Sequence, residues 1–194
     1  EQRNNAAYLP GDFAELLEAH PDWFLRDADG EPIVEGGKYY RMDPGSQGWR
    51  DFWLQRVLAA NDGWDGLFID NADLSLCGFQ DQGIDVPAYP DDASYLAAVR
   101  TFLQQVRTAY HEATGKPIVA NMVNECSDPG ARRQLYPSVQ GVMTERFAVG
   151  WGDDYLDPAE WSQQLARIRE EVRAGLQVVL VAQGEQGDED RQRF

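Results

Sequence analysis

Five short apolar runs, each followed by polar residues, alternate along this chain with segments of helical spacing. The runs are Lys38–Met42, Gly66–Ile69, Pro117–Ala120, Gly141–Thr144 and Leu176–Ala182. Apolar side chains recur every three or four residues over Ser46–Ala60, Asp92–Thr114 and Asp157–Gly175. Strands that alternate with helices build βαβ units, and such units form a parallel sheet. The order of the elements therefore predicts an α/β protein.

Each predicted helix has an apolar face that we expect to pack on the sheet. These faces hold Trp49, Phe52, Trp53 and Val57 in the first helix, Tyr95, Leu96, Val99, Leu103, Val106 and Tyr110 in the second, and Trp161, Leu165, Ile168 and Val172 in the third. The third helix also has end signals. Asp157 is a suitable N-cap, Pro158 suits the first turn and Glu160 completes a capping box. Gly175 is a suitable stop.

The length of the chain limits how much of a barrel it can form. A complete (β/α)₈ barrel needs about 250 residues, whereas 194 are present. With Asp22–Arg26 as a possible sixth strand, we predict a partial (β/α)₈ TIM-type barrel with parallel strands, lacking the first one or two units and the last. Residues 1–194 would form one incomplete catalytic domain, and an additional chain segment could complete it. A flavodoxin-like open sheet lacks its usual glycine-rich phosphate loop here.

Composition excludes several classes of partner. The net charge of −16 and the pI near 4.4 disfavour nucleic-acid binding and adhesion to anionic membranes. No apolar run approaches the roughly 18 residues of a membrane-spanning helix, so we expect no membrane insertion. His20 and His111 lie in different segments without zinc-binding spacing, and we predict neither a metal nor a cofactor.

The two cysteines, Cys77 and Cys126, follow consecutive predicted strands. Loops after neighbouring parallel strands are themselves neighbours, so a disulfide between these cysteines is geometrically possible. Two free thiols are an equally open interpretation.

Polar residues follow the apolar runs at the strand ends, where parallel α/β folds usually place their chemistry. Asp70 is the clearest case, because a buried parallel strand is almost continuously apolar and carboxylates there are costly without a partner or a task. The alternative is that Asp70 caps a turn or pairs with an arginine. The other polar residues in such positions are Asp43, Asn71, Asp73, Asn121, Asn124, Glu125, Glu145 and Gln183.

This set of residues favours glycoside hydrolysis. No Gly-x-Ser-x-Gly elbow, Cys–His pair or nucleotide loop supports acyl or phosphoryl transfer. Most glycosidases cleave the glycosidic bond with two carboxyl groups that flank it. Trp151, in the glycine-flanked loop Val149–Asp153, could stack on the face of a sugar or simply anchor its loop.

Three segments resemble a known family. Pro21–Gly30, Met42–Gly45 with Trp49-Arg50, and Trp64–Asp73 look like predicted bacterial glycoside hydrolases, related to endo-α-1,4-polygalactosaminidases and, more distantly, to α-galactosidase-like and α-amylase-like barrels. The resemblance extends from about Pro21 to Gln183 and implies a (β/α)₈ barrel. It also implies a secreted or cell-surface location.

The resemblance implies that Asp70, after the fourth barrel strand, is the nucleophile and that Glu145, after the sixth, is the general acid/base. The expected enzyme is a retaining glycosidase that acts on an α-linked poly- or oligosaccharide. Glu125 is the rival proton donor, because α-amylase-like barrels keep theirs after the fifth strand. The residues expected to contact the carbohydrate substrate are Arg41, Asp43, Asn71, Asp73, Asn121, Asn124, Glu125, Trp151 and Gln183.

Other interpretations stay open at this point. The chain could be an inactive fragment, or a carbohydrate-binding barrel that kept its cleft without turnover. It could also be a metal-dependent lyase or an aldolase-type barrel enzyme. Lys38 and Lys116, the only lysines, both precede predicted strands, which counts against Schiff-base chemistry.

Overall fold

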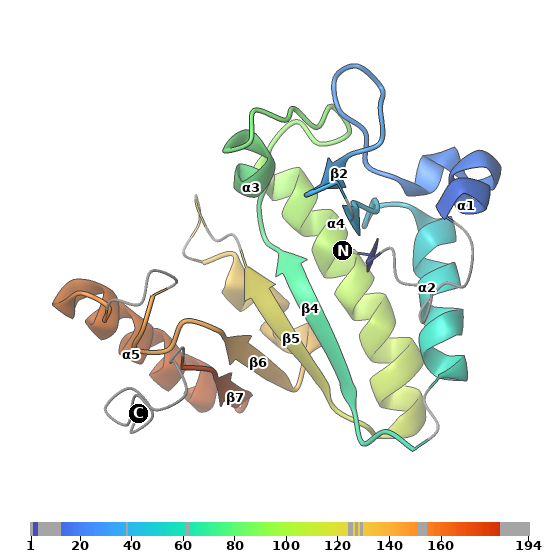
Figure 1. The fold of residues 1–194 in the computed structure, drawn as a ribbon. Coiled ribbons are helices and arrows are strands. Elements are labelled where there is room, and N and C mark those ends of the chain that lie inside the picture. The colour runs from blue at the N-terminus through green and yellow to red at the C-terminus, as the bar shows by residue number, and fades with distance from the viewer. Residues whose placement is uncertain are drawn as a thin grey trace, which may run out of the picture.

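A four-stranded parallel sheet forms the centre of the protein (Figure 1). The computed structural model describes residues 2–3, 13–37, 39–60, 63–123, 126, 128, 130–150 and 155–182. The strands, in spatial order, are β4 (Leu67–Asp73), β5 (Ile118–Val123), β6 (Gly141–Thr144) and β7 (Gln177–Leu180). All neighbouring pairs are parallel, and the spatial order follows the chain order. The predicted α/β class is therefore confirmed, and the consecutive parallel order of the strands is compatible with a partial barrel.

Helices connect these strands and carry the predicted signals. The helical elements are α1 (Phe13–Ala19), η1 (Pro21–Trp23), α2 (Gln47–Ala59), α3 (Cys77–Gln80), α4 (Asp92–Val106), its π-helical continuation η2 (Arg107–Glu112), η3 (Arg132–Ser138) and α5 (Pro158–Arg173). The capping box of Asp157 and Glu160 is present at the start of α5. Gly175 takes a φ of 85° just after that helix. No helix in the described part of the chain has both the length and the apolar character needed to cross a membrane.

The prediction of a parallel strand at Lys38–Met42 is wrong. Tyr39–Tyr40 form β3 (Tyr39–Tyr40), which pairs antiparallel with β2 (Val34–Glu35) and β1 (Gln2–Arg3) in a separate small sheet. Gly36 and Gly37, with φ of 57° and 66°, turn the chain between β2 and β3. Successive glycines supply the positive φ that a tight hairpin requires, so this segment folds back on its neighbour and does not join the parallel sheet.

The possible sixth strand at Asp22–Arg26 is also absent. Pro21–Trp23 form the short helix η1, and the residues that follow make only isolated antiparallel bridges, Phe24 with Met42 and Arg26 with Pro32. Trp23 and Phe24 instead enter a small aromatic cluster with Met42 and Trp49. Burial of these large side chains against α2 decides the local conformation.

The two faces of the parallel sheet are covered differently. Ile69, Ala120 and Val142 lie side by side in the register and belong to one hydrophobic core with side chains of α4 and η3. Side chains on a strand alternate between faces, so Phe68 and Asp70 lie on the opposite face. Phe68 is 49% exposed there, and Val179 on β7 is 42% exposed. Among the described residues, helices therefore cover one face, while Phe68, Asp70 and Val179 are exposed on the other.

The predicted apolar face of α5 is only partly correct. Val172 is 58% exposed, whereas Gln164 and Glu171 are buried at 7% and 0% exposure. Gln164 binds backbone atoms of the turn after β6, and Glu171 forms an ion pair with Arg132 of η3. These contacts engage both polar atoms of the Gln164 amide and one oxygen of Glu171, so α5 packs in part through polar contacts that apolar spacing does not reveal. By contrast, the predicted core residues of α4 are all buried.

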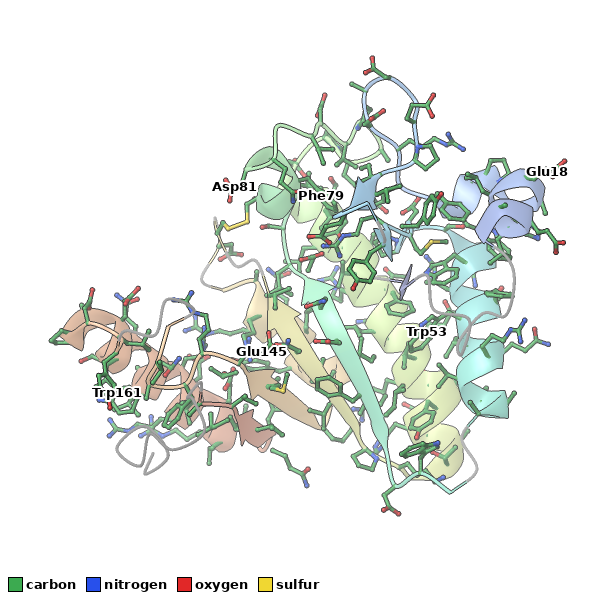
Figure 2. The ribbon with its side chains drawn as sticks, in the orientation of Figure 1. Glu18, Trp53, Phe79, Asp81, Glu145 and Trp161 are labelled. Atoms are coloured by element: carbon green, nitrogen blue, oxygen red, sulfur yellow. A yellow bond between two sulfur atoms is a disulfide. The ribbon has the colours of Figure 1, made fainter. Side chains whose placement is uncertain are left out.

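A disulfide joins Cys77 and Cys126 across 49 residues of sequence (Figure 2). Cys77 begins α3, just after β4, and Cys126 follows β5. The bridge that the sequence left open is thus formed. It ties together the loops that follow two adjacent strands at the end of the sheet where Asp70 lies.

Candidate active site

Asp70 lies in β4 at an interruption of the regular strand pairing. The register between β4 and β5 shifts between Ile69 and Ala72, and Asn71 takes a φ of 51°. Such bulges re-aim side chains and are frequent beside active sites. The Oδ1 atom of Asp70 accepts a hydrogen bond of 3.0 Å from the Nδ2 of buried Asn121, and another of 3.0 Å from the backbone amide of Asn71. The carboxylate is therefore exposed but held in one orientation.

Glu145 follows β6 directly, on a tight turn. Its side chain is half-buried (Figure 2). Ala148, three residues further on, is buried and has a φ of 65°. Among the described residues, Asn71 and Ala148 are the non-glycine residues with positive φ. Left-handed conformations are costly for such residues and concentrate at functional sites, and here one of them accompanies each candidate carboxylate.

The register brings the two strand ends onto the same side of the sheet. Asn121 is paired with Met143 of β6 and binds Asp70 of β4. Glu145 comes two residues after Met143. Adjacent strands are about 4.8 Å apart, so roughly 10 Å of sheet separates the backbones of β4 and β6. A separation of this size between the two backbones is wide enough for a sugar ring. The joint role of Asp70 and Glu145 stays a prediction.

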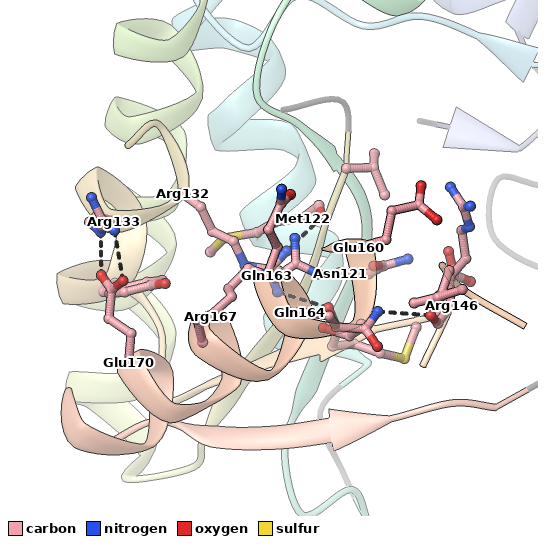
Figure 3. A pocket seen from close by; sticks show the side chains of 17 residues that line it. Asn121, Met122, Arg132, Arg133, Arg146, Glu160, Gln163, Gln164, Arg167 and Glu170 are labelled. Carbon is pink, nitrogen blue, oxygen red and sulfur yellow. Dashed lines mark hydrogen bonds and ion pairs between the residues drawn. The ribbon is translucent and has the colours of Figure 1, made fainter. Parts of the chain in front are cut away.

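The predicted site residues line two cavities. Arg41, Asp70, Asn71 and Asp73 line a cavity of about 480 Å³. Its aromatic lining comes from Trp49, Trp53, Phe68, Tyr95 and Phe102. Asn121 and Glu145 line a larger cavity of about 840 Å³ beside η3 and α5 (Figure 3). Because Asn121 donates its hydrogen bond to Asp70, one side-chain contact connects the walls of the two cavities.

Arg41 and Asp73, both expected to contact substrate, bind each other. The guanidinium of Arg41 lies 2.8 Å from a carboxylate oxygen of Asp73 and 2.8 Å from one of Glu35. It also stacks 5.4 Å from the ring centre of Phe79. Burial of the nearby Tyr95 hydroxyl and the negative charge of Asp73 both raise the pKa of that tyrosine. This buried pair attaches the end of β4 to the small antiparallel sheet.

Asp43 does not stand at the end of a parallel strand, because its segment belongs to the hairpin side of the molecule. Its carboxylate accepts hydrogen bonds from the hydroxyl of Tyr89 and from the backbone amide of Gly45, the latter at 2.7 Å. Burial and the hydrogen bond to Asp43 raise the pKa of Tyr89, so the phenol remains a donor. These contacts order the turn at residues 43–45, and a role for Asp43 in substrate binding stays a prediction.

Four of the predicted contact residues, Asn124, Glu125, Trp151 and Gln183, lie outside the described residues, and their roles stay predictions. Within the described part, no cluster of three or more His, Cys, Asp or Glu residues is placed to hold a metal ion.

Arg132, Gln164 and Glu171 were missed by sequence reasoning. Arg132 donates to the carbonyl groups of Met122 and Met143, each at 2.9 Å, and its Nε lies 2.7 Å from the Oε1 of Glu171. The buried guanidinium of Arg132 thus contacts β5, β6 and α5 at once. The sequence signal was weak, because Gln164 and Glu171 stand among many other polar and charged residues of the predicted helix, and their partners lie elsewhere in the chain.

Barrel enzymes carry their active sites at the carboxyl ends of parallel strands, which is where this sheet places Asp70 and Glu145. A family model described as "Hypothetical glycosyl hydrolase family 15" matches residues 2–194. The chain belongs to this family, and the resemblance to glycoside hydrolases seen in the sequence is confirmed. No curated protein matches the chain.

The chain is also similar to solved structures of α-galactosidases. The galactosidase domain of the α-galactosidase-sucrose kinase AgaSK is 12% identical, with a TM-score of 0.42 over 92% of this chain and 26% of that one. Two structures of the GH36 α-galactosidase AgaA from Geobacillus stearothermophilus, with stachyose and with raffinose, are 10% and 11% identical. Each has a TM-score of 0.40 over 92% of this chain and 27% of AgaA. The chain spans about a quarter of the length of these proteins.

Proposed function

We propose that this chain carries the catalytic carboxylates of a retaining glycosidase for α-linked poly- or oligosaccharides, with Asp70 as nucleophile and Glu145 as general acid/base. The observation that supports this most is the presentation of Asp70. An exposed carboxylate sits at a strand bulge on the open face of a parallel sheet, oriented by a buried asparagine. Membership of a glycosyl hydrolase family supplies the class of reaction.

The orientation of Asp70 suits attack on an anomeric carbon. Among the described residues, both hydrogen bonds to this carboxylate engage Oδ1, so Oδ2 is the atom that would form the bond. In the first step Asp70 bonds to the anomeric carbon, and Glu145 gives its proton to the departing oxygen. In the second step Glu145 takes a proton from water, which displaces Asp70 and restores the starting configuration.

Phe68 supports a carbohydrate as the ligand. Its ring is half exposed and stands on the same face as Asp70, two residues earlier in the strand. The carbon-bearing face of a sugar packs well on an exposed aromatic ring, while its hydroxyl groups seek polar partners such as Asn71 and Asn121.

We propose as well that further polypeptide completes the barrel around the open face. Parallel sheets are normally covered on both sides, whereas Phe68 and Val179 are exposed on this face and β4 and β7 are edge strands among the described residues. Activity is therefore best tested on the protein in its natural length.

The test is the replacement Asp70→Asn, with Asp65→Asn as the matched control. Asp65 is exposed and lies just before β4, at the opposite end of the same strand. Hydrolysis of α-linked galactosaminide and glucoside polymers should fall by at least about 10⁴-fold in Asp70→Asn, because the nucleophile is lost. Asp65→Asn should match the wild type.

Two outcomes would contradict the proposal. Equal hydrolysis by wild type and Asp70→Asn would remove Asp70 from the mechanism. A product that first appears with inverted configuration, followed by proton NMR, would remove its role as nucleophile. Binding of the glycans without turnover in the wild type would instead favour a carbohydrate-binding protein.

A further inference from the structure

A buried side chain of helix α5 forms hydrogen bonds to the turn that carries Glu145. The rings of Phe147 in this turn and Trp161 in α5 also pack together, with their centroids 5.3 Å apart. Gln164 of α5 is 7% exposed and reaches both sides of the turn. Its Nε2 donates a hydrogen bond of 2.8 Å to the carbonyl of Arg146 (Figure 3). Its Oε1 accepts one of 3.2 Å from the amide of Ala148. The donor and acceptor of one amide group therefore clamp the backbone immediately after Glu145.

The other hydrogen bonds described for this turn run between backbone atoms. Phe147 donates to the carbonyl of Val181 at 3.0 Å, and the carbonyl of Ala148 accepts from Leu156 at 2.9 Å. These bonds attach the turn to the segment after β7 and to the approach of α5, but they do not involve Arg146. Among the described contacts, Gln164 is thus the side chain of α5 that forms hydrogen bonds to the backbone of the turn, at Arg146 and Ala148.

The conformation of the turn makes such a clamp necessary. Ala148 is held at a φ of 65°, which is unfavourable for a residue with a Cβ and persists only when the surroundings impose it. Without Gln164, the carbonyl of Arg146 and the amide of Ala148 would lose their partner inside the protein. A buried backbone group without a partner is costly, so the turn would move to recover hydrogen bonds, and Glu145 would move with it.

We infer that Gln164 is the positioning residue that places the Glu145 carboxyl for proton transfer. The inference rests on the proposed role of Glu145 as general acid/base. Gln164 does not touch substrate in this scheme; it acts through the backbone of the 145–148 turn. A misplacement of about 1 Å at a catalytic group can lower a rate by about 10²-fold, which sets the size of the expected effect.

Gln164→Leu tests the inference, because leucine keeps a similar volume and loses both hydrogen bonds. Protonation of the leaving oxygen matters for a methyl glycoside but hardly for a dinitrophenyl glycoside, whose leaving group is already stable as an anion. We expect kcat/KM to fall by about 10- to 100-fold for the methyl α-glycoside and by less than about threefold for the dinitrophenyl α-glycoside. An equal loss on both substrates would overturn the positioning role.

A second readout does not depend on activity. Amide hydrogen exchange at Ala148 should be at least about tenfold faster in Gln164→Leu, while exchange in the middle of α5 stays unchanged, because the lost bond is local. Gln104→Leu, the same substitution at an exposed position of α4, is the control and should leave both readouts unchanged. Unchanged exchange at Ala148 would overturn the clamp itself.

The two readouts separate the two proposals. If the wild type and the Asp70→Asn variant hydrolyse equally, the glycosidase proposal fails and the placement of Glu145 for proton transfer fails with it, while faster exchange at Ala148 would still show the clamp. If the wild type is an active glycosidase but Gln164→Leu lowers kcat/KM equally for the methyl and the dinitrophenyl α-glycosides, the positioning role alone fails.

Discussion

The carboxylates at the ends of β4 and β6 are held in place in different ways. Each presents a carboxylate, Asp70 or Glu145, and each has a non-glycine residue with positive φ close behind it. Asp70 is still inside its strand and takes its orientation from Asn121 on the neighbouring strand. Glu145 stands beyond its strand, and a helix holds its turn in place through Gln164. A side chain within a sheet can thus be oriented by the sheet, whereas one on a turn depends on a more distant element.

The two ends are also anchored by different ion pairs. Arg41 forms ion pairs with two carboxylates, Asp73 at the end of β4 and Glu35 in β2. Arg132 joins β5 and β6 to the single carboxylate of Glu171, and both side chains of that pair are almost fully buried. Among the described residues, Arg132 thus pairs with one carboxylate, whereas Arg41 pairs with two.

The largest expected effect follows from that difference. Glu171→Gln leaves the charge of Arg132 buried without a counter-charge, which should lower the free energy of unfolding by about 3–5 kcal/mol. Urea denaturation followed by tryptophan fluorescence measures the loss. The neighbouring Glu170→Gln is the matched control at neutral pH, because the Arg133–Glu170 pair joins the same two elements at the surface. Equal losses in the two variants would show that burial does not distinguish the pairs.

A smaller loss is expected at the other strand end. Asp73→Asn removes one of the two carboxylates that contact Arg41, but Glu35 remains 2.8 Å from the same guanidinium. The free energy of unfolding should fall by about 1.5–3 kcal/mol, the usual cost of losing a hydrogen bond to a charged group. The same urea titration measures it, with Glu35→Gln at the half-exposed partner as the milder companion. A loss as large as that of Glu171→Gln would contradict the idea that Glu35 substitutes for Asp73.

The smallest effect concerns pH and the exposed pair. The hydrogen bond from Arg133 lowers the pKa of Glu170 below its ordinary 4.5. A carboxylate whose pKa is lower in the folded state contributes stability above its unfolded pKa, and that stability is lost as the pH falls through the folded pKa. The stability difference between wild type and Glu170→Gln should therefore be present above pH 4.5 and shrink below it. Urea denaturation midpoints at a series of acidic pH values measure this difference. A difference that does not change with pH would contradict the ion pair.

Much of the fold could be predicted because its signals are local. The ends of α5 follow from Asp157, Glu160 and Gly175, and the buried face of α4 follows from helical spacing. The hairpin of β2 and β3 also had a local signal in the consecutive Gly36 and Gly37, which the apolar run at Lys38–Met42 obscured. Apolar content alone does not distinguish a parallel strand from an antiparallel one.

The polar interior could not be predicted in the same way. Arg132 and Glu171 are 39 residues apart in the sequence, and each resembles an ordinary surface charge until the other is placed beside it. Gln164 likewise has a role only because the turn after β6 returns to the first half of α5. The candidate site is therefore half visible in the sequence: Asp70 stands out as an acid at the end of an apolar strand, whereas the support of Glu145 does not.

From its sequence alone, this chain is determined to be an α/β protein with consecutive parallel strands and with acidic and amide residues collected at one edge of the sheet. Periodicity, caps and strand ends depend on residues a few positions apart, so the order of amino acids encodes them directly. Only the tertiary structure decided which buried charges pair, whether the two cysteines form a disulfide and which helix holds the turn of Glu145. Those choices depend on removing specific groups from water together, and that requires the fold to have formed.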